Sequence, residues 1–142
     1  MALSGSEVTT DPTAPFAPPL VTEATIATLV QAFYARARRD PLLGPVFETA
    51  IGADWDAHML RICDFWSSVL LKSGRYQGTP LAVHATLDDV IGAEHFVRWL
   101  ELFRQTAREV CTEATAALFI DRAERIAESL RLGMAFQAGR MD

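Results

Sequence analysis

Apolar side chains recur at intervals of three and four residues along most of the chain, a spacing that places them on one face of an α-helix. The stretch from Gly52 to Lys72 shows this pattern most clearly. Its apolar stripe consists of Trp55, Met59, Ile62, Trp66, Val69 and Leu70. Residues 93–111 repeat the pattern, and a last helix is predicted from Glu113 to about Phe136. Its inward face is predicted to consist of Ala116, Ile120, Ala123, Ile126, Ala127 and Leu130.

The first predicted helix begins at Thr22 and Thr25, whose hydroxyls suit a helix start, and Asp40-Pro41 ends it. Between these signals lies an apolar stripe of Ile26, Leu29, Val30, Phe33 and Ala37. Pro41 and Pro45 bracket what the sequence predicts to be a short corner. Only a short helix, which contains His84, fits between Thr79 and Val90.

No run of strict apolar and polar alternation is long enough to predict a strand. The first 20 residues hold four of the seven prolines among Ser, Thr and Ala, and we expect them to form a flexible tail. The sequence therefore predicts a single all-α domain over residues 21–142, with four main helices joined by short corners.

The charge and the apolar content exclude several classes of protein. The chain has 18 acidic and 13 basic residues, a formal charge of −5, and a single lysine, Lys72. Such a surface repels phosphate backbones, so nucleic acid is not an expected partner. No apolar run approaches the roughly 20 residues of a membrane span, and no basic segment leads into a secretory signal. We expect a cytoplasmic protein without membrane association, in which Cys63 and Cys111 are reduced, buried, small apolar residues.

Each of the three histidines has an ordinary structural explanation. His58 lies at the edge of an apolar stripe and His84 lies among leucine and alanine, where a histidine commonly packs and forms a hydrogen bond. His95 follows Glu94 at a predicted helix start, so a surface or capping role is expected. No two histidines are spaced for a zinc site, no serine has the strand–turn–helix context of a nucleophile, and the isolated glycines form no phosphate-binding loop.

With these sites excluded, the side chains left to carry a function are one imidazole on a short helix, a second imidazole on a long helix and many aromatic rings. A flat apolar cofactor held by one axial histidine needs such residues. Five segments carry a more specific pattern: AFYARARRDPLLGPVF with Phe33 and Tyr34, DWDAHMLRI with Trp55 and His58, DFWSSVLL from Asp64, YQGTPLAVH from Tyr76 to His84, and RWLELF from Arg98 to Phe103.

In their order and spacing, these segments resemble the group III truncated haemoglobins, a family of small bacterial globins. The resemblance covers roughly residues 24–136. It implies a truncated globin-like fold, a two-over-two helical sandwich around b-type haem.

The resemblance also implies a role for each matching residue. It makes His84 the proximal iron ligand, Tyr34 the distal hydrogen-bond donor and His58 the distal residue that gates ligand entry. Trp99 would line the distal side with its indole N–H, and Arg61 would meet a haem propionate. The implied haem slot consists of Phe33, Phe47, Ile62, Phe65, Trp66 and Phe96.

Three functional hypotheses follow. The first is a haem protein that binds oxygen, nitric oxide or carbon monoxide at a five-coordinate iron. The second is an enzyme on the same haem, a nitric-oxide dioxygenase or a peroxidase-like enzyme, which would need a separate reductase because the chain has no flavin or nicotinamide domain. The third is a helical interaction module without a cofactor. The oligomeric state stays open.

Overall fold

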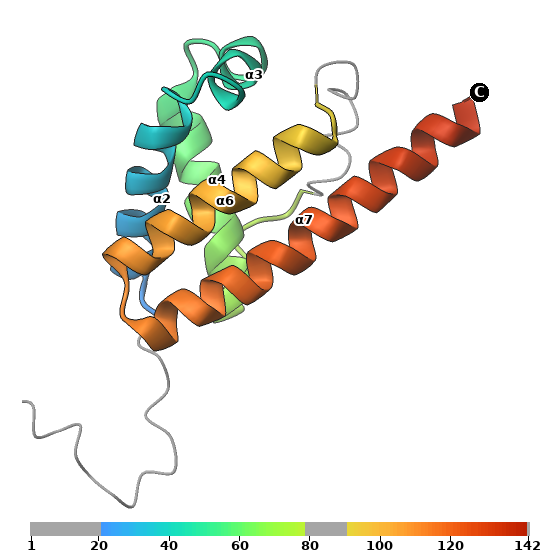
Figure 1. Ribbon diagram of the computed structural model, residues 1–142. Coiled ribbons are helices and arrows are strands. Elements are labelled where there is room, and N and C mark those ends of the chain that lie inside the picture. The colour runs from blue at the N-terminus through green and yellow to red at the C-terminus, as the bar shows by residue number, and fades with distance from the viewer. Residues whose placement is uncertain (1–20, 79–90, 142) are drawn as a thin grey trace, which may run out of the picture.

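The computed structural model describes residues 21–78 and 91–141, and every regular element in these residues is a helix (Figure 1). The helices are α2 (Glu23–Ala37), α3 (Leu43–Ala50), α4 (Trp55–Leu71), α6 (Ala93–Val110) and α7 (Glu113–Met141). Helix α2 packs against α4 and α6, and α6 runs antiparallel along α7. The predicted all-α class is confirmed. The expected tail at 1–20 and the short helix expected between Thr79 and Val90 lie outside the described residues.

The core lies among α2, α4, α6 and α7. Its most buried large side chains are Ile26, Leu29, Phe33, Phe103 and Phe119. Cys63 and Cys111 are free thiols that pack against this core but are only partly buried, which corrects the expectation of full burial. Burial raises the pKa of both thiols, so they stay protonated at neutral pH. None of the described helices is both long enough and apolar enough to cross a membrane.

The predicted start of the first helix is confirmed by its cap. The Thr22 hydroxyl accepts a hydrogen bond from the backbone N–H of Thr25 at 3.1 Å, and the Thr25 hydroxyl accepts one from the N–H of Thr22 at 3.3 Å. The two threonines thus satisfy each other's exposed backbone donors, which fixes where α2 begins.

The four predicted main helices correspond to α2, α4, α6 and α7, but helix α3 replaces the short corner predicted around Pro41 and Pro45, so the prediction of a corner there was wrong. Pro45 lies in the first turn of α3, where a backbone N–H has no partner within the helix and its absence does no harm. Gly44 explains how the turn fits, because a Cβ there would lie 2.6 Å from the carbonyl oxygen of Arg38. The close approach of these backbones requires glycine.

Asp40 ties α3 to the rest of the fold. Its carboxylate is buried and accepts hydrogen bonds from the N–H groups of Leu42 and Leu43 at 3.1 and 3.0 Å, and from Nε of Arg98 at 2.7 Å. Burial opposes ionisation, but the hydrogen bonds from Leu43, Arg98 and Leu42 outweigh it and hold the pKa of Asp40 below its usual value. One ionised side chain therefore joins the start of α3 to α6.

We expect Asp40→Asn to lower the free energy of unfolding at pH 7 by about 1.5–3 kcal/mol, the usual contribution of a hydrogen bond to a charged group. Because the pKa of Asp40 is lowered in the folded state, its stabilisation is present above the unfolded pKa of about 4 and is lost as the pH falls through the folded value. The difference between variant and wild type should therefore shrink below about pH 4. Urea denaturation at pH 7 and at pH 3 measures it, and an equal difference at both pH values would contradict the role of the charge.

Candidate functional site

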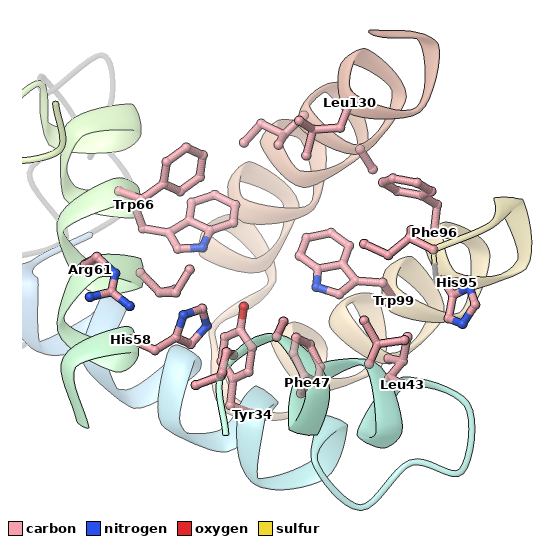
Figure 2. Close-up of a pocket in the computed structure, with 18 of the residues that line it drawn as sticks. Tyr34, Leu43, Phe47, His58, Arg61, Trp66, His95, Phe96, Trp99 and Leu130 are labelled. Carbon is pink, nitrogen blue, oxygen red and sulfur yellow. The ribbon is translucent and has the colours of Figure 1, made fainter. Parts of the chain in front are cut away.

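A cavity of about 350 Å³ lies among α2, α3, α4, α6 and α7 (Figure 2). Most of its lining side chains are aliphatic or aromatic. A concave, mostly apolar space of this size with a few polar groups is typical of a site for a small organic molecule or a cofactor.

Three polar rings meet in the cavity wall, and each comes from a different helix. They are Tyr34 of α2, His58 of α4 and Trp99 of α6. The ring centroids of Tyr34 and His58 are 5.6 Å apart, with the planes at 88°. Figure 2 shows the Tyr34 hydroxyl pointing into the cavity between the imidazole and the indole. The three residues that the resemblance assigned to the distal side therefore lie together.

Trp99 lies beside the Tyr34 hydroxyl in the cavity wall. An indole N–H can only donate, so it can approach only the lone pairs of the phenolic oxygen and does not compete for the hydroxyl proton. That proton is therefore available to an acceptor in the cavity. Burial raises the pKa of the Tyr34 phenol well above its usual value, the neighbouring Trp99 opposes the rise, and the nearby Cys63 adds to it. Tyr34 is therefore a neutral donor throughout the physiological pH range.

Stacked aromatic rings hold Trp99 in place. The ring of Phe103 lies parallel to Trp99 at 5.1 Å and to Trp66 at 5.5 Å, with 14° between the planes in each pair. The ring of Phe33 makes edge contacts with Tyr34 and with Trp99, at 4.8 and 5.5 Å between ring centroids. The structure places Phe33, a predicted slot residue, in the core behind Tyr34 and Trp99 rather than in the cavity lining.

The other predicted slot residues do line the cavity. They are Phe47, Ile62, Phe65, Trp66 and Phe96. Arg61 also reaches the cavity, with its side chain 56% exposed and its Nη2 3.9 Å from Oδ2 of Asp54. A cation therefore lies at the edge of an otherwise apolar space.

The predicted iron ligand His84 lies outside the described residues. The chain on both sides of that segment adjoins the cavity, because Tyr76 and Ile91 are part of the lining. Tyr76 is fixed by a hydrogen bond from its N–H to Oγ of Ser68 at 2.8 Å and by a perpendicular contact with Phe65 at 5.3 Å.

Several lining residues were missed from the sequence. Helix α3 contributes Leu43, Val46 and Ala50, besides Phe47, and α7 contributes Ile126, Ala127 and Leu130. The α7 residues lie on the predicted apolar face of the last helix, which was the available signal, whereas α3 itself was not predicted. His95 lines the cavity as well, and its expected capping role is confirmed because its Nδ1 accepts a hydrogen bond from the N–H of Gly92 at 2.8 Å.

The fold and the site define the chain as a truncated globin, and comparison with known proteins identifies the group. The chain belongs to the group 3 truncated haemoglobins. It is 36% identical over 110 residues to the group 3 truncated hemoglobin ctb of Campylobacter jejuni. The aligned region covers 75% of this chain and 86% of that protein. No family model matches the chain.

The structural comparison agrees. The crystal structure of a group III truncated hemoglobin from Campylobacter jejuni is similar to this chain with a TM-score of 0.75 and 33% sequence identity. The match covers 81% of this chain and 92% of the other. Together with the packing of α2, α4, α6 and α7, this confirms the predicted two-over-two helical fold.

Proposed function

We propose that the chain is a b-type haem protein that binds oxygen, nitric oxide and carbon monoxide at a five-coordinate iron. The observation that carries the proposal is the meeting of Tyr34, His58 and Trp99 in the wall of a largely apolar cavity. Membership of the group 3 truncated haemoglobins supports it.

The lining residues fit the shape and polarity of haem. A haem presents two flat apolar faces and needs polar partners only at its iron and its carboxylates. Phe47, Phe65, Trp66 and Phe96 supply aromatic and apolar contacts, and Arg61 supplies a cation for a carboxylate at the cavity edge. His84 would hold the iron of the haem, and the positions of Tyr76 and Ile91 in the lining support this proposal from both sides of its segment.

When bound, haem supplies an iron centre at which a diatomic ligand gathers partial negative charge. Tyr34 is suited to stabilise that charge because its hydroxyl is neutral and already points into the cavity between His58 and Trp99. A donor already aimed at the place where charge develops stabilises it without further reorganisation. His58 is proposed to gate the approach to this donor, since its ring packs against Tyr34 at the cavity wall.

Titration with hemin tests the proposal. We expect the purified chain to bind hemin in a 1:1 ratio with a sharpened Soret band, and to form a carbon monoxide complex after reduction. The same titration of His95→Ala, in which a cavity histidine outside the proposed iron site is removed, should give the same spectra. A chain that leaves the spectrum of free hemin unchanged would be a helical module without haem.

A further inference from the structure

Tyr34 and His58 share a third aromatic neighbour, Trp55, which has no assigned role. The ring of Trp55 lies 5.9 Å from Tyr34 and 5.4 Å from His58, at 60° and 86° to their planes. With the 5.6 Å contact between Tyr34 and His58, the three rings form a closed triangle of edge contacts. His58 cannot turn away from the cavity without giving up its contacts with both other rings.

Hydrogen bonding does not hold Trp55 in this triangle. Its indole N–H is buried and has no acceptor within residues 21–78 and 91–141. The contact that fixes its face is with Arg38, whose guanidinium carbon lies 4.1 Å from the ring centroid. A guanidinium over the face of an indole is an attractive cation–π arrangement.

Arg38 connects the two helices that carry the triangle. It is the C-cap of α2, and its N–H donates to the carbonyl oxygen of Tyr34 at 3.0 Å. Its side chain then reaches Trp55, the first residue of α4. The N-cap of α4, Asp54, forms no capping hydrogen bond with its side chain. The first turn of α4, which carries His58, is therefore tied to the end of α2 by the contact of Arg38 with Trp55, in addition to the 5.8 Å contact of Trp55 with Phe47 of α3.

We propose that Trp55, clamped by Arg38, is a positioning residue that keeps the His58 ring against Tyr34 and so limits the rate at which a small ligand enters the cavity. The inference rests on the proposed function for its kinetic consequence. The position of His58 itself is measurable without any ligand.

The test removes the clamp from the surface, where the fold is least affected. Arg38→Gln removes the cation, and Arg39→Gln is its matched control, because Arg39 is the next residue, is also exposed and carries the same charge. Arg38→Lys restores a cation. The first measurement is the NMR spectrum of the His58 ring protons in the purified protein, in its carbon monoxide form if it carries haem. The second is the association rate of carbon monoxide after flash photolysis.

In Arg38→Gln we expect the His58 ring resonances to move toward those of an exposed histidine, because the ring leaves its two aromatic neighbours. The association rate should rise about two- to fivefold, which corresponds to the ~0.5–1 kcal/mol of an exposed cation–π contact. Arg38→Lys should recover part of both changes, and Arg39→Gln should show neither.

Unchanged His58 resonances in Arg38→Gln, or equal shifts in Arg39→Gln, would overturn the clamp. Shifted resonances with an unchanged association rate would overturn its role in ligand entry. If the chain bound no haem, the proposed function would fail, while the NMR comparison would still decide whether Arg38 and Trp55 position His58.

Discussion

Tyr34→Phe should release oxygen about ten- to a hundredfold faster than the wild type. The hydroxyl is expected to donate to a ligand with partial negative charge, and such a bond contributes about 1.5–3 kcal/mol, at ~1.4 kcal/mol per factor of ten. The bond forms only after the ligand has arrived, so the change should appear in dissociation rather than in association. Stopped-flow displacement of oxygen measures it. Phenylalanine keeps the ring that packs against Phe33, Phe47 and Trp55, so the fold should persist.

Carbon monoxide is the internal control for this variant. It gathers less charge than oxygen, so its dissociation from Tyr34→Phe should change far less. Equal changes for the two gases would show that Tyr34 acts through its bulk. If neither changed, the hydroxyl would have no role in ligand retention.

His84→Ala should lose most of its haem or hold it through a different ligand. An axial nitrogen is the only strong bond expected between the chain and the cofactor, whereas the described cavity wall offers mainly apolar contacts. Haem content and the absorption spectrum of the reduced protein measure the loss.

His95→Ala is the matched control for this second variant. Its Nδ1 is engaged by the N–H of Gly92, so its removal should weaken a helix cap and leave the spectrum unchanged. Full haem content with a wild-type five-coordinate spectrum in His84→Ala would refute the assignment of the proximal ligand.

The long helices were predictable because each has an apolar stripe to bury, but the last one runs to Met141 rather than to the end expected near Phe136, where no proline marks a stop. The Thr22 and Thr25 pair marks the start of α2, and Asp40 follows its end. Helix α3 was hidden because prolines normally interrupt helices, and Pro45 escapes that rule only by lying in the first turn. Its short apolar stretch also lacks the length needed to show a helical period.

The candidate site was predictable only through the resemblance. Tyr34, His58 and Trp99 lie far apart in sequence, and no spacing rule relates residues on separate helices. The wall contributed by α7 shows a related difficulty, because a helix face turned toward a core and one turned toward a cavity have the same apolar period. Ile126 and Leu130 were therefore recognisable as inward-facing, but not as part of a cavity.

The stretch from Arg36 to Asp40 contacts α3, α4 and α6, three of the helices that border the cavity. Arg36 reaches α6 through a hydrogen bond to Thr106, Arg38 reaches α4 through the ring of Trp55, and Asp40 joins α3 to α6. A deletion or insertion of one residue in this stretch would put all these contacts out of register at once. The corner at 111–112, whose residues do not line the cavity, carries no such set of contacts. The chain should therefore tolerate a one-residue insertion or deletion at the corner between α6 and α7 better than at the end of α2.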